Sequence, residues 1–282
     1  MNDLKIGVIG LGRFGQFHCE KISGLEDGRL YGVYDTSDLL TIQTAKHFDC
    51  IPFGTPDSLL DLVDAVSVVS PTVTHFEYIK KALRRDVHVF VEKPITATCV
   101  EGREAVRLAR ERQLVLQVGH IERFNEALVG KQNVIVDPLC ANAIRTCGDN
   151  RRCKDVCVIF DMMIHDIDIM LHHFGDWKEV DATGDEDKVV ATVGFGDRRE
   201  AVLMANRLGT MDTRRTIFHF MSEPPITVDY HQKSNDALKE ELQDFVDAIT
   251  QGRNPLVTGE DGLRAIELAE AIREEVINGR SL

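Results

Sequence analysis

Short apolar runs alternate with amphipathic segments along the first 120 residues. The apolar runs have the length of buried strands, and the segments between them repeat their apolar residues at helical spacing. The pattern predicts strands at Leu4–Ile9, Leu30–Tyr34, Ala65–Ser70, Val87–Val91 and Leu114–Val118, and helices at Arg13–Ser23, Thr36–Phe48, Thr74–Arg85 and Thr98–Gln113. Strands that alternate with helices form a doubly wound parallel sheet, so we expect an α/β domain here.

The second half of the chain has a different order, with one apolar helix followed by consecutive strands. The periodicity predicts a helix at Val158–Phe174 and strands at Val189–Phe195, Glu200–Arg207, Arg215–Met221 and Ile226–Tyr230. Consecutive strands indicate an antiparallel or mixed sheet. The segment Ala201–Ala205 is apolar on both faces, so we expect helices to cover one face and a second subunit the other. Helical spacing returns near the C-terminus, where Thr258 and Asp261 form a capping-box pattern.

A glycine-rich turn joins the first predicted strand to the first predicted helix. It runs Gly10-Leu11-Gly12-Arg13-Phe14-Gly15 and has G-x-G-x-x-G spacing. Gly10 would allow the tight turn, Gly12 would let the backbone approach a pyrophosphate, and Gly15 would let the helix pack against the strand. The helix N-terminus would direct its N–H groups and positive dipole end at the phosphates. The strand–turn–helix context favours dinucleotide binding over an ordinary glycine turn. The candidate cofactor contacts in the turn are Gly10, Gly12, Arg13, Phe14 and Gly15.

An acidic residue, Asp35, ends the second predicted strand. It follows the glycine turn by about 20 residues, the separation at which a carboxylate accepts hydrogen bonds from ribose hydroxyls and repels a 2′-phosphate. Thr36 and Ser37 come next and supply no arginine to bind such a phosphate. These residues favour NAD over NADP. The alternative role for Asp35 is to cap the helix that follows.

Two later loops lie at the carboxyl ends of predicted strands, the edge at which open α/β sheets bind ligands. They run Ser70-Pro71-Thr72-Val73-Thr74-His75 and Glu92-Lys93-Pro94. A lysine after a strand is commonly a solvated cation, but at this edge Lys93 would face the cofactor crevice. The candidate cofactor residues in these loops are Ser70, Pro71, Thr72, His75, Glu92 and Lys93.

Polar residues form a stripe along the predicted helix Val158–Phe174. The stripe consists of Asp161, His165, Asp168 and His172. These positions are i, i+4, i+7 and i+11, so at about 100° per residue they share one face. The rest of the helix surface is mostly Met, Ile, Leu and Phe, so the helix is expected to be buried and its stripe must satisfy itself or face a cavity. Acidic groups beside a histidine in a dry pocket are suited to proton transfer.

Two other interpretations of the stripe remain open. It could be a satisfied structural network, or Asp161, His165 and Asp168 could bind a metal ion, which a nearby Lys93 would oppose. Asp166 and His173 lie off the stripe and are expected to be solvated or to support it.

Composition limits the class of partner. The chain has 282 residues, of which 43% are hydrophobic and 28% charged, and its formal net charge is -13. Such a surface repels phosphate backbones and anionic lipid, so we expect a small-molecule substrate and neither nucleic acid nor membrane. No apolar run approaches the roughly 20 residues of a membrane span, and the start has no signal-peptide pattern, so we expect a cytoplasmic protein.

Cysteine usage agrees with that compartment. The seven cysteines are scattered and are expected to be buried thiols. Cys147, Cys153 and Cys157 lack the paired spacing of a zinc site, so no metal is expected.

Together these residues resemble the glucose-fructose oxidoreductase / inositol dehydrogenase / rhizopine catabolism (Gfo/Idh/MocA) family over nearly the whole chain. The resemblance rests on the glycine turn, on Glu92-Lys93-Pro94, and on the pair Asp161 and His165. It implies an NAD-binding Rossmann domain at 1–121 and a substrate-binding and oligomerisation α+β domain at 122–282. The second domain would carry a large, open, mostly antiparallel sheet, and the assembly would be a homodimer or homotetramer. The resemblance also implies that Lys93, Asp161 and His165 line the active site beside the nicotinamide.

Two segments are similar to a subgroup of this family, the UDP-N-acetylglucosamine 3-dehydrogenases. They are Val118–Asn125, with the letters V-G-H-I-E-R-F-N, and Asp155-Val156 followed by Asp161–Asp168. The similarity implies oxidation of the 3-hydroxyl of a UDP-N-acetylhexosamine to a ketone, with Arg123, Asn125 and Asp168 as substrate contacts. The diphosphate would need cations, although most candidates are expected to be surface charges. These candidates are Arg123, Arg145, Arg151, Arg152, Lys154 and Arg207.

The expected chemistry assigns a role to each active-site residue. His165 would accept the hydroxyl proton as hydride leaves the same carbon, Asp161 would orient the imidazole, and Lys93 would stabilise the developing alkoxide. Histidine ordinarily titrates near neutral pH, which favours it as the base, with Lys93 as the alternative base. Two other functions stay open: a dehydrogenase of a free polyol or sugar such as inositol, and a non-catalytic NAD-linked sensor. The joint presence of Lys93, Asp161 and His165 argues against the sensor.

Overall fold

The computed structural model of the protein describes residues 3–148, 156–232 and 235–279. The chain packs into two units. The first consists of Met1–His120 and Asp236–Leu263, and the second of Ile121–Asn235 and Arg264–Leu282. The division expected from the sequence follows chain order, whereas the structure packs residues 236–263 with the N-terminal unit.

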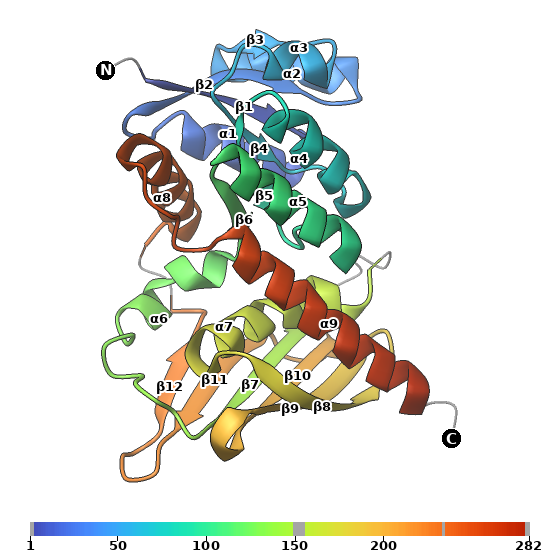
Figure 1. The fold of residues 1–282 in the computed structure, drawn as a ribbon, viewed down its shortest axis with the longest axis vertical. Coiled ribbons are helices and arrows are strands. Elements are labelled where there is room, and N and C mark those ends of the chain that lie inside the picture. The colour runs from blue at the N-terminus through green and yellow to red at the C-terminus, as the bar shows by residue number, and fades with distance from the viewer. Residues whose placement is uncertain (1–2, 149–155, 233–234, 280–282) are drawn as a thin grey trace. The chain divides into compact units, whose positions relative to one another are not determined.

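A six-stranded parallel sheet forms the centre of the first unit, with the strand order β3-β2-β1-β4-β5-β6 (Figure 1). Its strands are β1 (Leu4–Ile9), β2 (Gly28–Tyr34), β3 (Ile51–Pro52), β4 (Ala65–Val68), β5 (His88–Glu92) and β6 (Leu116–Gly119). Its helices are α1 (Arg13–Ile22), α2 (Asp38–Phe48), α3 (Pro56–Leu60), α4 (His75–Leu83), α5 (Cys99–Arg112) and α8 (Ala237–Gln251). The strand order reverses between β1 and β4, and this switch point is where such sheets bind ligands. The predicted doubly wound sheet is confirmed.

Two elements of the first unit are too short to be recognised from a periodicity in the sequence. The pattern predicts neither the two-residue strand β3 nor the five-residue helix α3. Helix α3 is held instead by local chemistry, since Thr55 accepts a hydrogen bond from the Ser58 N–H and Pro56 starts the helix.

The second unit contains a six-stranded mixed sheet with the order β12-β11-β7-β10-β9-β8. Its strands are β7 (Cys140–Gly148), β8 (Trp177–Gly184), β9 (Lys188–Phe195), β10 (Arg199–Gly209), β11 (Thr213–His219) and β12 (Ile226–Asp229). The central pair β7 and β10 is parallel, while the other pairs are antiparallel. The expected open and mostly antiparallel sheet is therefore confirmed.

The sequence pattern predicts neither β7 nor β8. The inward positions of β7 are Ala141, Ala143 and Arg145, so small and charged residues stand where an apolar alternation would be recognised. Only Ala182 of β8 is buried among its described positions. Both strands are fixed by their neighbours, β7 by β10 and β11, and β8 by β9.

One face of the second sheet is covered by α7 (Ile164–Phe174), which lies across β7 and β10 (Figure 1). On β10, Ala201, Leu203 and Ala205 are buried, whereas Val202 and Met204 on the opposite face are half-buried. The alternation agrees with a strand that is apolar on both faces.

The helix predicted at Val158–Phe174 is not α-helical throughout. Residues Ile159–Met163 form a π-helical turn, and the α-helix begins only at Ile164. A π turn holds more residues than an α turn, so the even spacing expected between Asp161 and the rest of the stripe is wrong. Such turns occur frequently at functional sites.

The C-terminal helices follow the predicted pattern. Phe245 of α8 packs its ring edge-on against Phe90 of β5, with ring centres 5.9 Å apart. The predicted capping box of α9 (Gly259–Gly279) is confirmed, because the Thr258 N–H donates to Asp261 and the Asp261 N–H donates to Thr258. In the described part of the chain, no helix combines the length and the apolar character that crossing a bilayer requires.

Candidate active site

The glycine turn after β1 lies directly against the loop after β4. Gly10 has φ +91°, and a Cβ at this position would lie 2.6 Å from the Ser70 backbone nitrogen. A Cβ on Gly15 would collide with the Gly10 carbonyl oxygen. The turn therefore requires glycine at both positions, and it brings two of the predicted cofactor loops together.

The space around Gly12 fits a cofactor phosphate. Gly12 has an ordinary φ of -59°, and apart from its own and neighbouring residues along the chain, no described heavy atom lies within 4 Å of the Cβ it would carry. Gly12 is the N-cap of α1, and among the described residues no side chain caps this helix N-terminus. The first-turn N–H groups of α1 can thus donate to a pyrophosphate. Arg13 and Phe14 open the same helix, and Phe14 is exposed.

Asp35 follows β2 and holds the glycine turn in place. Its Oδ2 accepts a hydrogen bond from the Leu11 N–H at 2.8 Å, and its Oδ1 accepts one from the Ser37 N–H at 2.9 Å. The N-cap of α2 is Ser37, so the alternative role of Asp35 as a helix cap is wrong. The half-buried carboxylate thus lies directly beside the glycine turn.

His75 joins the loop after β4 to the loop after β5. Its Nε2 lies 2.8 Å from the Ser70 carbonyl oxygen, and its Nδ1 lies 2.9 Å from the Pro94 carbonyl oxygen. The ring is 1% exposed, and this burial lowers the pKa of His75 even though both carbonyls raise it. A carbonyl oxygen can only accept, so a neutral ring donates to one of the two and lies in contact with the other. The side chain predicted as a cofactor contact thus faces protein backbone on both sides.

Within the same loop, the Ser70 and Thr74 hydroxyls are 2.7 Å apart, and Thr74 also donates to the Pro71 carbonyl. These bonds close the turn that contains Thr72.

Glu92 ends β5 and lies in a buried chain of hydrogen bonds that the sequence did not reveal. Its Oε1 is 3.1 Å from His18 Nε2, and His18 Nδ1 is 2.9 Å from the Ser67 hydroxyl. Burial raises the pKa of Glu92, but the His18 bond and the charge of Lys93 outweigh it, so the pKa is lowered. The second carboxylate oxygen, Oε2, accepts from the Lys93 N–H at 3.2 Å. His18 is separated from Glu92 by 74 residues, which is why no motif joins them.

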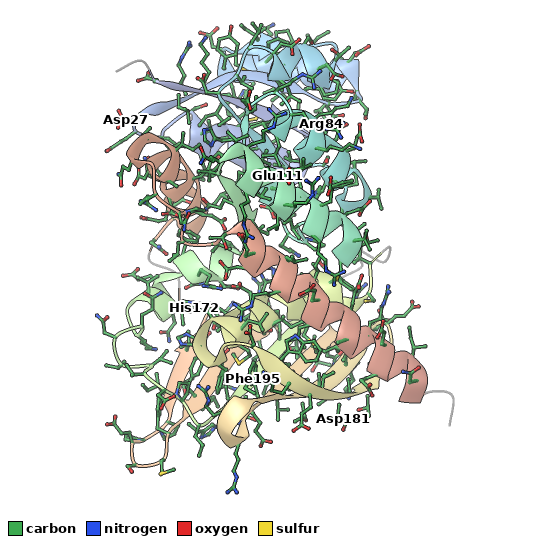
Figure 2. The ribbon with its side chains drawn as sticks, in the orientation of Figure 1. Asp27, Arg84, Glu111, His172, Asp181 and Phe195 are labelled. Atoms are coloured by element: carbon green, nitrogen blue, oxygen red, sulfur yellow. The ribbon has the colours of Figure 1, made fainter. Side chains whose placement is uncertain are left out.

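In the second unit, Arg123 and Asp168 form a buried ion pair. The guanidinium donates from Nε and Nη2 to both carboxylate oxygens, at 2.7 and 2.8 Å. Its Nη1 donates to His172 Nδ1 at 2.6 Å, and His172 lies on the exposed side of α7 (Figure 2). Two predicted substrate residues, Arg123 and Asp168, are therefore brought together with His172 of the polar stripe, and their first effect is to fix α7.

A second buried network surrounds Arg145. This arginine donates from Nε and Nη2 to Asp166, and from Nη1 to Glu122 at 2.9 Å. Burial raises the pKa of Asp166, and the Glu122 carboxylate adds to this effect, while Arg145 opposes it. Asp166 is buried, which excludes the solvated alternative and leaves a supporting role, since its pair with Arg145 holds α7 on the sheet.

Asn125 also belongs to this framework. Its side chain caps α6 (Glu126–Val129) by accepting from the Ala127 N–H, and its amide donates to Glu122 and to the Tyr230 carbonyl. The residue is 2% exposed. The segment V-G-H-I-E-R-F-N thus contributes a set of buried anchors rather than a surface.

The candidate diphosphate cations differ from the expected surface charges. Arg123 and Arg145 are buried in the pairs described above, and Arg207 is 5% exposed and donates to the Val156 carbonyl. Arg151, Arg152 and Lys154, like Cys153 and Asp155, lie outside the described residues.

Asp161 and His165 stand at the junction of the π turn and α7. Asp161 lies within the turn, and His165 is the second residue of the α-helix. Both side chains are half-buried, whereas Asp168 further along is buried. The pair is therefore partly accessible, whereas Asp168, the next residue of the polar stripe, is enclosed.

Comparisons with known proteins connect these features. The model of an oxidoreductase family with an NAD-binding Rossmann fold matches residues 4–120, and the model of its C-terminal alpha/beta domain matches residues 207–282. The UDP-N-acetylglucosamine 3-dehydrogenase of Acidithiobacillus ferrooxidans is 31% identical to the chain, and the alignment covers 98% of each. The solved structure of that enzyme superposes with a TM-score of 0.93 over 98% of both chains.

Inositol dehydrogenases are also similar. The myo-inositol 2-dehydrogenase of Thermotoga maritima is 26% identical, over 99% of this chain and 98% of that one. The scyllo-inositol dehydrogenase of Lactobacillus casei, solved with NAD(H) and scyllo-inositol, shares the fold with a TM-score of 0.87 over 98% of both chains at 22% identity. The glycine turn, the open helix N-terminus and Asp35 fit the cofactor that these matches imply. The chain belongs to the Gfo/Idh/MocA family of NAD-binding oxidoreductases and is an NAD-dependent dehydrogenase.

Proposed function

We propose that the protein oxidises the 3-hydroxyl of a UDP-N-acetylhexosamine to a ketone, with reduction of NAD. The observation that carries the proposal is the 31% identity to a UDP-N-acetylglucosamine 3-dehydrogenase over 98% of both chains. The inositol dehydrogenase of Thermotoga maritima matches over a similar length at 26%. The likeness therefore extends through both units and is stronger to the nucleotide-sugar enzyme than to this polyol enzyme.

The first unit is assigned to cofactor binding. The glycine turn and the N-terminus of α1 would hold the pyrophosphate, and Asp35 would accept from the ribose hydroxyls. Arg13, Phe14, Ser70, Pro71 and Thr72 would line the same edge of the sheet. When bound there, NAD supplies a hydride acceptor for the carbon that carries the reacting hydroxyl.

Proton transfer is assigned to Lys93, Asp161 and His165. As the carbon loses its hydride, its hydroxyl loses a proton, and His165 would accept that proton. Asp161 would stabilise the charged imidazole, and Lys93 would stabilise the alkoxide that develops on the oxygen. The products are a ketone, reduced cofactor and one proton. Lys93 is the alternative base.

The substrate side is assigned to Arg123, Asn125 and Asp168. These residues would act by holding the helices α6 and α7. Arg123 and Asp168 fix α7 by their two-point pair. Asn125 fixes the start of α6 and the Tyr230 backbone. We propose that these residues set the shape of the sugar pocket.

Oxidation of a free cyclic polyol is the second candidate function. The match to the Thermotoga maritima enzyme favours it. The same proton-transfer residues would serve either substrate, so the chemistry of Lys93 and His165 does not separate them.

An assay of NADH formation separates the two candidates. Purified protein with NAD would be supplied in turn with UDP-N-acetylglucosamine, UDP-N-acetylgalactosamine, myo-inositol, scyllo-inositol and free N-acetylglucosamine. The proposal expects the highest kcat/KM for a UDP-N-acetylhexosamine. Oxidation of an inositol with no response to either nucleotide sugar would transfer the assignment to the second candidate.

We also propose a homodimer or homotetramer that works in the cytoplasm. On the sheet face opposite α7, Ile144, Val202, Met204 and Ile217 are half-buried, and a second copy would cover them. Cys19 is a buried free thiol, as a reducing compartment favours. Sedimentation equilibrium that gives only monomer at micromolar protein would contradict the oligomer.

A further inference from the structure

The segment Glu92-Lys93-Pro94 has a buried histidine bonded to it on each side. Before the lysine, His18 of α1 lies 3.1 Å from the Glu92 carboxylate. After the lysine, His75 of α4 lies 2.9 Å from the Pro94 carbonyl oxygen. The two rings are 0% and 1% exposed. Neither ring belongs to the segment, and each comes from a different helix.

The His18 side of this arrangement has a defined direction. A carboxylate can only accept hydrogen bonds, so His18 Nε2 must donate to Glu92, while His18 Nδ1 lies 2.9 Å from the Ser67 hydroxyl, a group that can donate or accept. The other Glu92 oxygen accepts from the Lys93 N–H. A hydrogen-bonded chain therefore runs from β4 through His18 and Glu92 to the Lys93 backbone.

The absence of a side chain on Gly119 leaves room for the Glu92 carboxylate. Gly119 of β6 lies beside it, and a Cβ on Gly119 would be 3.2 Å from the carboxyl carbon and from both of its oxygens. The carboxylate is thus enclosed by β6 on one side and by His18 on the other. A partly buried carboxylate benefits from such partners, because enclosing an ionised group without them is expensive.

The His75 side connects to the glycine turn. The second nitrogen of His75 lies 2.8 Å from the Ser70 carbonyl oxygen, and Ser70 is in turn packed against Gly10. The position of Pro94 is thus coupled to the loop that follows β4.

We infer that His18 and His75 are positioning residues that together hold the Lys93 backbone in its reactive place. They form a two-sided clamp, defined here as His18 bonded to Glu92 and His75 bonded to Pro94. The inference rests on the proposed role of Lys93 in proton transfer. His75 is a candidate cofactor residue of the sequence analysis, and the clamp assigns it instead to the protein backbone, because both of its ring nitrogens face carbonyl oxygens. A displacement of about 1 Å at a reacting group can cost about 100-fold in rate, so such a clamp has a measurable effect.

Pairs of amide variants distinguish positioning from mere stability. Glutamine can imitate the Nε2 of histidine, and asparagine can imitate its Nδ1. His18→Gln would therefore keep the donor to Glu92, whereas His18→Asn would lose it. At position 75 the order reverses, because His75→Asn would keep the donor to Pro94 and His75→Gln would lose it.

The chain offers a matched control on the same strand. His88 begins β5, at the opposite end from Glu92, and its Nδ1 accepts from the Val115 N–H at 3.0 Å. His88→Asn removes a half-buried ring without touching the clamp, and its amide oxygen can take the place of Nδ1 as acceptor for the Val115 N–H. It is expected to lower thermal stability and to leave kcat within about twofold of the parent protein.

The experiment combines hydrogen exchange of the cofactor-free protein with steady-state kinetics. His18→Asn and His75→Gln are expected to speed amide exchange in the peptide containing Lys93 about tenfold, and their partner variants to exchange as the parent does. In the presence of substrate, kcat should fall about 10- to 100-fold in the first two variants, while the KM for NAD changes less than about threefold.

Two results would overturn the clamp. One is equal exchange at the Lys93 peptide in the asparagine and glutamine variants of both positions. The other is an equal increase of that exchange in His88→Asn. Because exchange is measured without substrate, these outcomes stand apart from the proposed role of Lys93 in proton transfer, which fails instead if Lys93→Met keeps the full kcat.

Discussion

Arg123 and Asp168 form a two-point ion pair whose side chains are 3% and 1% exposed. The pair links the turn after the first unit's last strand to the middle of α7, across 45 residues of sequence. A buried pair of this kind fixes geometry, but the loss of one member leaves an uncompensated charge in the interior. Both residues were expected to contact the substrate. Their pairing also contributes to the stability of the fold, which can be measured without substrate.

Each single substitution in this pair should lower the free energy of unfolding by more than half of the loss seen in the double variant. Arg123→Ala and Asp168→Ala are each expected to lower the free energy of unfolding by about 3–5 kcal/mol, because each leaves its partner buried and unpaired. The double variant should lose less than the sum of the two. Urea unfolding of all four proteins measures the coupling. Additive losses below about 1 kcal/mol, typical of exposed pairs, would contradict the account.

The glycine turn allows cofactor binding to be separated from folding. Gly12→Ala adds a methyl group into open space with an ordinary φ, so thermal stability should stay close to that of the parent. The same methyl group would occupy the approach of the pyrophosphate, so NAD affinity should fall about tenfold or more.

Gly15→Ala provides the contrast, because its Cβ would meet the Gly10 carbonyl and destabilise the fold itself. Thermal unfolding and NAD titration by calorimetry measure both effects. Undiminished NAD affinity in Gly12→Ala would show that the pyrophosphate lies elsewhere.

Turnover should depend strongly on His165. His165→Asn is expected to lose about 10²- to 10⁴-fold in kcat if the imidazole is the base. The acid limb of the pH–rate profile should then disappear in His165→Asn and persist in Lys93→Met. His231→Asn, an exposed histidine of the same unit, is the control and should retain the parent kcat. If the limb persists in His165→Asn and is lost in Lys93→Met, the base is Lys93.

Acid stability should respond to His173. Burial, with the charges of His172 and Arg123, lowers the pKa of this histidine from 6.5 to about 4. The unfolded chain therefore binds a proton before the folded one, so the stability that is present above pH 6.5 is lost as the pH falls towards about 4. His173→Gln should show a smaller loss across this range in denaturant unfolding.

Part of the acid sensitivity should remain in that variant, since burial also lowers the pKa of His75 and His88. An unchanged pH dependence in His173→Gln would mean that His173 titrates alike in the folded and unfolded chains.

The features that sequence could predict are those whose cause is local. The glycine turn, the capping box of Thr258 and Asp261, and the alternation of the first unit all depend on residues within one turn or one strand. The strand β7 escaped prediction because Ala141, Ala143 and Arg145 occupy its inner face, and Arg145 is tolerated there only through Asp166 and Glu122. That compensation is invisible until the chain has folded.

The candidate site shows the same division. Lys93 and His165 could be proposed because each lies in a recognisable local context. His18 could not, since its partner Glu92 is 74 residues away and a histidine on a helix carries no signal of its own. The π turn at Ile159–Met163 was also hidden, because an apolar sequence with α-helical periodicity accommodates one wider turn without any change in composition.

The most direct test of the account follows the hydride from a single carbon. UDP-N-acetylglucosamine labelled with deuterium at C3 would be incubated with the protein and NAD, and the reduced cofactor and the sugar product analysed by mass spectrometry. The account predicts that the deuterium appears in the reduced nicotinamide and that the product is the 3-ketone. Two results would contradict it. One is reduced cofactor that lacks the deuterium. The other is no reduced cofactor from UDP-N-acetylglucosamine when a parallel incubation with an inositol does reduce NAD.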